Sequence, residues 1–566
     1  MATRKHLPRL HRRVLDWTEV FAADIRSLAA LRVVLALTML VDLFERATNL
    51  RVHYTAEGIL PRRILIDQID HWQFSLALMN DTRFFQALLF AVAAVAALAM
   101  LVGYRTRLMT FVVWVLILSI QVRNPFVNSS ADDLLRILLF WSMFLPLGTW
   151  WSVDYMRGTA TQPPSLRVLS MATAGLFLQI AFVYWFTVWL KSGPEWRVNG
   201  TALYYALSIE ELASPLGTYV LQFSTLLKVL TFGTLGVELG ATLLLFCPVF
   251  TGPVRTAAVM AIIALHAGIW LTMSIGFFPW LAASCMVCFL PSWFWDTLIP
   301  RLRTAFPKFS NAAFATGQAA TGVAQAFQAT LWPRLMSLGS AGQFSITAVP
   351  AITRRGRTDG ASPIPTTPSV GRTPADAHTK LRMNRSSFFL NLVTGFFLVY
   401  VFVWNLTTVS AVTITEDARA LGRFLGLAQY WTMFAPYPTN GSTWFIIPGT
   451  LRDGREIDLL PALLHDDPNL LPEVDWEKPR NLRSYFNGEE RWRKYFEVLS
   501  GDHYPDLLLP FGQYICINWN NAHQGSPLEL EAFDINYYWQ PTLEDYHLGS
   551  PQQTVLWTHD CYPGSP

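Results

Sequence analysis

The chain has 566 residues, of which 52% are hydrophobic, 14% aromatic and only 15% charged. This composition excludes an ordinary soluble protein of that length, and the polar stretches after residue 295 exclude a chain that lies in the membrane throughout. A formal net charge of +3 predicts no nucleic-acid partner, and five cysteines are too few for a disulfide-based scaffold. No metal site is predicted.

The N-terminal part of the chain is basic and then strongly apolar. Residues 1–27 carry six Lys and Arg residues and are predicted to be a cytoplasmic basic arm. No small-residue cleavage pattern follows the first apolar run, so that run is predicted to be a start-transfer helix rather than a removed signal peptide. Candidate membrane spans are residues 28–44, 87–102, 108–122, 134–147, 168–190, 225–250, 256–274, 276–295 and 387–406.

Several of these runs are shorter than the ~20 residues that a perpendicular span requires, so about eight or nine transmembrane helices are predicted. Lys and Arg are concentrated in the N-terminal arm and in residues 300–385, which places the N-terminus in the cytoplasm. The first external loop departs from this rule and is predicted to fold back as structure rather than hang as a linker. Its arginines are Arg46, Arg51, Arg62, Arg63 and Arg83.

The remaining segments complete a polytopic α-helical membrane protein with a C-terminal extracytoplasmic α+β domain. Residues 28–299 form the main transmembrane domain. Residues 300–385 are rich in Ala, Thr, Pro, Gly and Arg and are predicted to be a disordered cytoplasmic linker. Residues 386–409 hold the last transmembrane helix, and residues 410–566 form the external domain.

Short β-like runs dominate that last domain. Residues 444–451 and 456–460 predict a hairpin with an Asp-Gly turn. Residues 489–499 predict an amphipathic helix, and residues 513–518 predict another strand. Cys516 and Cys561 both fall in the domain, and whether they pair depends on a geometry that the sequence leaves open.

Ionisable residues within apolar spans are costly in lipid, so each is a candidate for function. Lys191 ends an apolar, aromatic run and precedes the turn Ser192-Gly193-Pro194. One interpretation is an interfacial anchor that snorkels to the headgroups and pairs with Glu195. The other is a desolvated, neutral amine that acts as a base. Local sequence does not separate these two interpretations.

Other polar residues lie deeper in the predicted spans. Glu238 stands between two glycines that permit close helix approach. His266 is of a type that is more often a hydrogen-bonded core residue than a catalyst. Arg32 and Asp42 are expected to be an ion pair or helix-end charges, and Arg136 completes the set.

Cys285 and Cys288 form a C-x-x-C pattern on one helix face. In a soluble redox protein this spacing would indicate a dithiol site. In an Ala- and Met-rich span, cysteine also serves as a small apolar side chain. Thiol–quinone redox chemistry therefore remains an alternative.

Several stretches, in chain order, resemble the HTTM (horizontally transferred transmembrane) family, the bacterial relatives of vitamin K-dependent γ-glutamyl carboxylase. The segment Lys191-Ser-Gly-Pro-Glu-Trp196 resembles the part that holds the proposed base of the family. The other stretches are Arg32 with residues 39–46, then 54–61, 103–105, 128–130, 144–148, 151–154, 200–205, His266 with 274–278, 430–436 and 452–454.

The resemblance implies a bacterial inner-membrane protein that uses vitamin K hydroquinone or a related quinol. It implies that Lys191 is the base and that His266, Glu238 and Asn128 are candidates for the quinol pocket. Trp431 and Met433 resemble the segment where a peptidyl-glutamate substrate is held. The carboxylase has histidine where this chain has Ser129, and residues 431–436 lack its His and Arg. These departures argue against glutamate carboxylation and leave quinol oxygenation open.

Three functions are thus predicted as alternatives. The first is a quinol-dependent oxygenase or carboxylase, a lyase-like enzyme, that uses Lys191. The second is a non-catalytic membrane module that anchors an external binding or scaffold domain. The third is thiol–quinone redox through Cys285 and Cys288. Predicted partners are membrane lipids and a peptidyl-glutamate or other extracytoplasmic protein.

Overall fold

The structure is a computed structural model that describes residues 17–301 except 71 and 159–164, and residues 385–562 except 487, 488, 502, 545 and 546. Most of the predicted basic arm and most of the predicted linker therefore lie outside the described residues. Residues up to Ile299 and from Leu390 onward form one unit, to which the following description refers.

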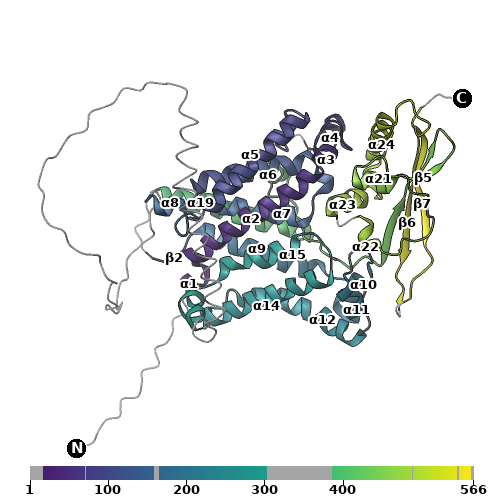
Figure 1. Cartoon of the computed structure of the whole chain (residues 1–566). Helices are drawn as coiled ribbons and strands as arrows, with labels where there is room; N and C mark the ends of the chain where they lie inside the picture. Colours follow the sequence, from purple (N-terminus) through teal and green to yellow (C-terminus); the bar gives the residue numbers. More distant parts are fainter. Residues whose placement is uncertain are drawn as a thin grey trace, which may run out of the picture. The chain divides into compact units, whose positions relative to one another are not determined.

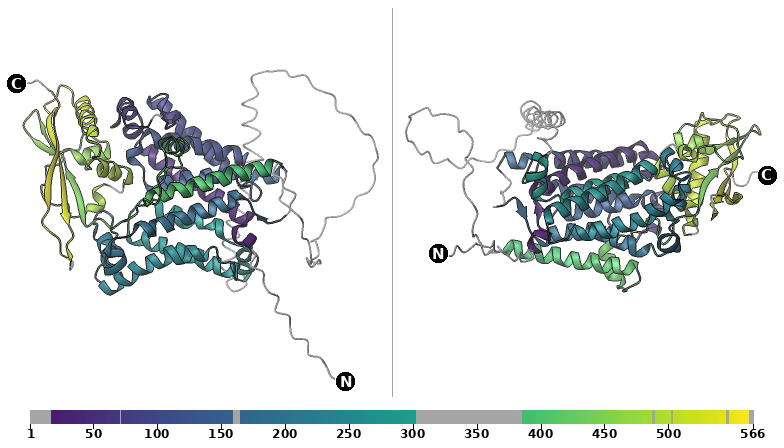
Figure 2. Two further views of the ribbon diagram at one scale, coloured as in Figure 1. Left: turned by 180° about the vertical axis from the view of Figure 1, so that it is seen from behind. Right: turned by 90° about the horizontal axis from the view of Figure 1, so that it is seen from below.

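Long apolar helices lie side by side in this unit (Figures 1 and 2). Seven of them in the described ranges are long and apolar enough to cross a membrane, and a bent pair at residues 278–289 and 294–301 would make eight. The seven are α2 (Ile25–Thr48), α5 (Arg83–Val102), α6 (Thr106–Arg123), α9 (Met171–Leu190), α12 with its continuation (Ser224–Leu244), α14 (Thr251–Thr272) and residues Phe388–Thr408 of α19 (Arg385–Thr408).

A shorter helix, α7 (Ser130–Ser142), packs among them and is buried along most of its length. Its start is set by a capping box, in which the Ser129 side chain and the Asp132 side chain each accept a backbone N–H of the first turn. The turn between α5 and α6 requires Gly103, which has φ of 71° and lies so close to Ser152 that a Cβ would meet its side chain at 2.3 Å.

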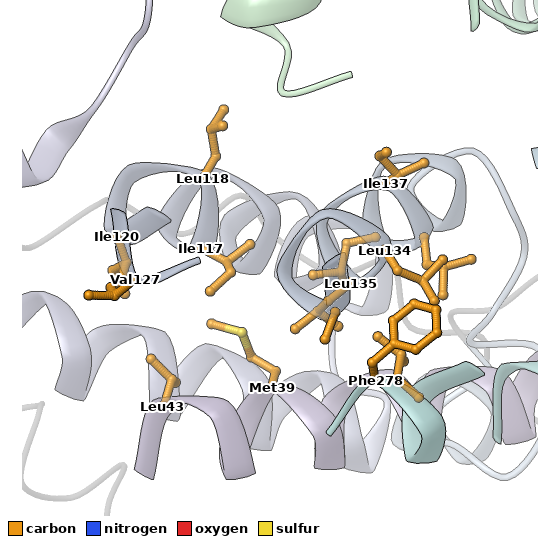
Figure 3. Close-up of a cluster of buried hydrophobic side chains, with 14 of the residues drawn as sticks. Met39, Leu43, Ile117, Leu118, Ile120, Val127, Leu134, Leu135, Ile137 and Phe278 are labelled. Carbon is orange, nitrogen blue, oxygen red and sulfur yellow. The ribbon is translucent and has the colours of Figure 1, made fainter. Parts of the chain in front are cut away.

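The core of the helical part lies between α2, α6, α7 and α15 (Phe278–Ser284) (Figure 3). Met39 and Leu43 of α2 face Ile117 and Ile120 of α6, and Leu134 of α7 lies near Phe278. These side chains are almost fully buried. These side chains contact neither water nor lipid. Their close packing is therefore the main factor that determines how the helices are arranged.

Small elements fill the segments between the long helices. The first loop is folded, as predicted: α3 (Leu50–Tyr54), α4 (Arg62–Gln68) and a 3-10 turn (Leu76–Leu78) precede α5. The other short elements are α1 (Trp17–Phe21), β1 (Ala23–Asp24), α8 (Val153–Met156), β2 (Arg167–Val168), α10 (Ala202–Ser208) and α11 (Pro215–Val220). Strands β1 and β2 pair antiparallel.

The C-terminal part is an α+β domain with one antiparallel sheet. Its strands are β3 (Gly441–Ile446), β4 (Pro448–Leu451), β5 (Glu456–Asp458), β6 (Leu530–Pro541) and β7 (Gln552–Asp560). Strand β6 pairs with β7 on one edge and with β3 and β4 on the other, and β4 pairs with β5. The helices are α20 (Glu416–Phe424), α21 (Leu459–His465), α22 (Leu482–Tyr485), α23 (Glu490–Leu499) and α24 (Leu508–Ala522).

Two details of the predicted domain need correction. The Asp-Gly hairpin is present between β4 and β5, but the predicted first strand is divided at Ile447 and the second ends at Asp458, where α21 begins. The prediction of a strand at residues 513–518 is wrong, because this segment lies inside α24. The buried residues Phe511, Tyr514, Ile515 and Trp519 follow the period of a helix. The amphipathic helix at 489–499 is confirmed as α23.

Cys516 and Cys561 form a disulfide bond, with their Cα atoms 5.4 Å apart. The bond ties α24 to the end of β7, which are 45 residues apart in the sequence. It therefore closes a long loop and joins the helical and strand layers of the domain.

Candidate functional site

Lys191 lies at the C-terminal end of α9 and is only 4% exposed. Its Nζ is 2.7 Å from Oε1 and 2.8 Å from Oε2 of Glu238. The same nitrogen lies 4.4 Å from the centroid of the Trp196 ring, a cation–π distance. The interpretation of Lys191 as an exposed anchor paired with Glu195 is therefore wrong, because the ammonium is buried and its partner is on another helix.

The backbone around Lys191 is held by a neighbouring guanidinium. Arg197 Nε donates to the Lys191 carbonyl over 2.7 Å, and Arg197 Nη2 donates to the Val188 carbonyl. The last carbonyls of a helix have no partner within the helix, and a cation there complements the helix dipole. Arg197 thus ends α9 and fixes the direction in which the lysine side chain leaves it.

The segment after the last long helix packs against this turn. Trp196 Nε1 donates to the Phe434 carbonyl over 2.8 Å, and Gly193 N donates to the Pro436 carbonyl over 3.0 Å. A Cβ on Gly193 would meet the Pro436 carbonyl at 2.8 Å, so glycine is needed for this close approach. Two stretches that the sequence analysis singled out separately, 191–196 and 430–436, are therefore in contact.

Both sides of the ion pair lie at π-helical turns. One spans Glu195–Asn199, just after Lys191, and the other spans Val237–Ala241 and contains Glu238. A π turn inserts an extra residue into a helix, costs regular hydrogen bonding and is frequent at functional sites. The Glu238 side chain, 7% exposed, is directed by this turn toward α9.

His266 and Trp431 lie along the same part of α9. Tyr184 Oη is 2.8 Å from His266 Nε2, and His266 Nδ1 has no hydrogen-bond partner among the described residues. Thr187 Oγ1 donates to the Trp431 carbonyl over 3.3 Å. Trp431 is fully buried, and Met433 is partly buried against the core. Helix α9 therefore brings Lys191, Glu238, His266 and Trp431 together.

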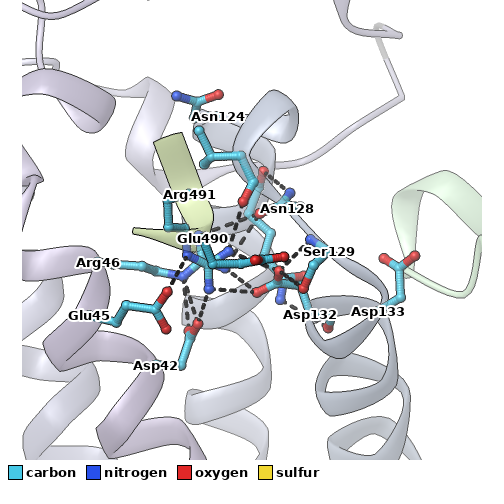
Figure 4. A network of polar contacts seen from close by, with 12 residues as sticks. Asp42, Glu45, Arg46, Asn124, Asn128, Ser129, Asp132, Asp133, Glu490 and Arg491 are labelled. Carbon is cyan, nitrogen blue, oxygen red and sulfur yellow. Dashed lines mark hydrogen bonds and ion pairs between the residues drawn. The ribbon is translucent and has the colours of Figure 1, made fainter. Parts of the chain in front are cut away.

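Asn128 is not part of this cluster and belongs to a separate charge network (Figure 4). Its Oδ1 accepts from Arg46 over 3.4 Å, and its Nδ2 donates to the Gln121 carbonyl over 2.9 Å. The placement of Asn128 gives no support to the prediction that it lines a pocket with Lys191.

The charge network joins the helical part to the C-terminal domain. Arg491 of α23 contacts Asp42 of α2 at 2.5 Å and Asp132 of α7 at 2.9 Å. Arg46 contacts the same two carboxylates, at 2.9 Å for Asp42. All four residues are 1% exposed or less. The two arginines and the two aspartates carry balancing charges, and the partly exposed Glu45 lies 3.8 Å from Arg491. The Arg491 guanidinium also donates to the Val127 carbonyl over 2.8 Å.

Arg32 and Arg136 donate hydrogen bonds to backbone carbonyls. Arg32 donates to the carbonyls of Leu147, Trp150 and Trp151 in the loop between α7 and α9, so it does not pair with Asp42. Arg136 donates to Gln121, Asp133 and the carbonyls of residues 426 and 428. Both satisfy loop carbonyls that would otherwise be buried without partners.

Sequence analysis missed Arg491, Asp132 and the role of Arg46. Asp132 lies before the start of the predicted span, and Arg491 lies in a helix that resembles that of a soluble protein. The available signal was the run Ser129-Ser130-Ala131-Asp132, which has the spacing of a capping box and an acidic first turn. Nothing in the sequence indicated that Arg491 would meet it.

His53 of α3 lies beside this network and gives it a pH dependence. It is 1% exposed, and neither ring nitrogen has a hydrogen-bond partner in the described parts of the chain. Burial, together with the charges of Arg491 and Arg46, lowers the pKa of His53 from 6.5 to about 3. As the pH falls, His53 is therefore protonated in the unfolded chain before it is protonated in the folded protein. At pH values below 6.5, the free energy of unfolding is expected to decrease by up to about 1.4 kcal/mol for each pH unit.

Thermal unfolding of His53→Phe and of the unchanged protein, from neutral pH down to about pH 4, measures this contribution. Phenylalanine keeps an aromatic ring against Trp492, whose centroid is 4.9 Å from that of His53. The variant is expected to lose less stability on acidification. Identical pH profiles for the two proteins would contradict the assignment to His53.

Cys285 and Cys288 are free thiols and almost fully buried. They lie in a 3-10 turn (Cys285–Phe289) within the apolar core, and Cys285 Sγ donates to the Ala282 carbonyl. These surroundings favour their role as small apolar side chains. In residues 17–301 and 385–562, outside the stated gaps, no group of His, Cys, Asp and Glu is placed to hold a metal ion.

The helical part corresponds to a known domain. Residues 21–293 match the family model of the HTTM domain. Comparison with curated proteins and with solved structures gave no match. The match covers the helices that build both the Lys191–Glu238 pair and the membrane side of the charge network. The chain is therefore a membrane protein whose residues 21–293 are an HTTM domain.

Proposed function

We propose that the HTTM domain serves as an anchor that holds the domain after residue 410 in a fixed position on the extracytoplasmic face of a membrane. The observation that carries this proposal is the buried network of Asp42, Arg46, Asp132 and Arg491. Breaking a buried charge pair costs several kcal/mol, about 3–5 in measured cases. A flexible tether between the two parts would need no such contact.

The disulfide supports the extracytoplasmic side. Disulfides persist in oxidising compartments and are rare in the cytosol. Cys516 and Cys561 are bonded within the C-terminal domain. The excess of Lys and Arg in the N-terminal arm and in residues 300–385 is consistent with those segments lying on the opposite side.

The contacts of Lys191 also favour an anchoring function of the HTTM domain over a role of this residue as a catalytic base. A general base needs a free electron pair, whereas this amine faces both oxygens of Glu238 and the ring of Trp196. That arrangement suits a charged ammonium whose partner compensates its burial. Among the described residues, the contacts of Nζ are to Glu238 and Trp196, so the site presents a paired ammonium rather than a free amine to a quinol.

Complementation in a strain that lacks the gene tests the proposal. The variant Lys191→Met/Glu238→Gln is expected to complement this strain like the unchanged protein. It removes the ionisable groups of the pair but keeps side chains of similar volume. Arg491→Met, which releases the C-terminal domain, is expected to fail. Both must reach the membrane at the level of the unchanged chain. Failure of the double variant at a normal level and melting temperature would contradict a purely anchoring role.

A second candidate function is proton-transfer chemistry at the Lys191–Glu238 pair on a membrane-soluble substrate. The observation that favours it is the π turn that follows Lys191 and the π turn that contains Glu238, together with the contact between Tyr184 of α9 and His266 of α14. In this case Glu238 would accept a proton from the Lys191 ammonium and leave a neutral amine as base.

This candidate is tested with membranes that contain the protein, reduced vitamin K, oxygen, labelled bicarbonate and a glutamate peptide. An epoxide product or fixed label that disappears in Lys191→Met/Glu238→Gln would establish it. A product that persists in the variant would exclude Lys191 as the base. The anchoring function predicts no product that depends on either residue.

A further inference from the structure

A cavity of about 460 Å³ lies where the end of α2, helix α3 and the start of α5 meet the C-terminal domain. Its polar side is lined by Arg51, Arg83 and Asp466, and its apolar side by Leu50, Ala87 and Phe90. Three segments that are distant in the sequence build it, so its shape depends on the fold rather than on one loop.

The charges of the cavity leave one cation without a partner. Arg51 contacts Asp466 and also donates to Asn518 Oδ1 over 2.9 Å. Arg83 is exposed and makes no ion pair with any residue that the structure describes. The three charged groups therefore sum to a net positive charge, which favours an anionic ligand. Arginine presents several N–H donors in one plane, which matches the geometry of a phosphate.

Helix α5, which supplies Ala87 and Phe90 to the cavity, also carries exposed apolar residues. Phe84 is 79% exposed, Val95 is 66% exposed, and Leu88 and Leu98 are about half exposed. These residues are four, seven and three positions apart along the helix, so they form one face. Since α5 is one of the helices long and apolar enough to cross a membrane, this face is suited to lipid chains.

We infer that this cavity binds the phosphate-bearing headgroup of an anionic phospholipid, with an acyl chain along the exposed face of α5. The arginines would contact the phosphate, and Ala87 and Phe90 would contact the glycerol end of the chain. The inference also explains why arginines occur in a loop that the positive-inside rule predicts to be poor in them. It involves neither Lys191 nor the charge network of Asp42, Arg46, Asp132 and Arg491, but it rests on the docked C-terminal domain of the proposed function through Asp466.

Native mass spectrometry of the full chain in neutral detergent, titrated with phosphatidylglycerol or phosphatidylcholine, tests the inference. The unchanged protein is expected to prefer phosphatidylglycerol. Arg83→Ala is expected to weaken that binding about fivefold, from the loss of one arginine at a lipid phosphate. Arg63→Ala is the matched control, because Arg63 is an exposed arginine of the same loop, in α4, and does not line the cavity. Its binding is expected to stay unchanged.

Two results would overturn the inference: equal affinity of the unchanged protein for both lipids, or equal losses in Arg83→Ala and Arg63→Ala. Inorganic phosphate in a parallel titration separates a lipid headgroup from a free anion. Failure of phosphate to displace phosphatidylglycerol supports a lipid. Displacement by phosphate at the same concentration as the lipid, dependent on Arg83, would show a free-phosphate site instead. Arg83→Lys keeps the charge and is expected to recover most of the binding.

Discussion

Arg491→Met is expected to lower the free energy of unfolding by about 3–5 kcal/mol, the range measured when one partner of a buried ion pair is removed. Asp42 and Asp132 are fully buried, and without Arg491 only Arg46 remains to compensate two carboxylates. The Val127 carbonyl also loses its donor. Denaturation of the protein in detergent measures the effect, and faster proteolytic release of the C-terminal domain should accompany it.

Arg493→Met is the control for this variant. Arg493 lies on the same helix, two residues further on, and pairs with Glu490 and Glu497 at 2.6 and 3.2 Å. Its partners stay closer to solvent, so its loss is expected to cost about 1 kcal/mol or less. If the two variants were equally stable, the network would not hold the domains together, and the anchoring proposal would lose its main support.

Separate replacement of Lys191 and of Glu238 is expected to destabilise the protein by about 3–5 kcal/mol each, because each leaves the other charge buried and alone. The double variant Lys191→Met/Glu238→Gln is expected to recover most of this loss, since no uncompensated charge remains. The melting temperatures of the four proteins complete a double-mutant cycle, from which the coupling free energy of the pair follows.

The pair Lys478–Glu210 gives a matched reference for that cycle. It joins the same two chemical groups at 2.6 Å, but its side chains are 22% and 38% exposed. Its coupling is expected to stay below about 1 kcal/mol. Additive losses at Lys191 and Glu238 would mean that the two side chains do not form the pair described, and both functional proposals for that site would need revision.

Much of this arrangement was predictable, because apolar runs and the ionisable residues within them can be read locally in the sequence. Ionisable residues in lipid are energetically costly, so each one is a candidate for function. That rule pointed to Lys191, Glu238 and His266, and α9 does bring them together. It could not supply the pairing, since Lys191 and Glu238 are 47 residues apart and Glu195 was the nearer candidate.

Contacts between domains were beyond the reach of sequence patterns. Arg491 meets Asp132 across 359 residues, and its own helix has an ordinary amphipathic pattern. The wrong strand at residues 513–518 has a different cause. Its Tyr and Ile residues have high β-propensity, but burial of the Phe511–Trp519 face of α24, which contacts β6 and β7, stabilises a helix instead.

The charge network also has a consequence for biosynthesis. Ribosomes make the N-terminal part first, so Asp42, Arg46 and Asp132 are inserted long before Arg491 exists. During that interval Asp42 and Asp132 have Arg46 but not Arg491 as a charged partner. The two buried carboxylates therefore gain their second arginine only when the last domain has emerged and docked.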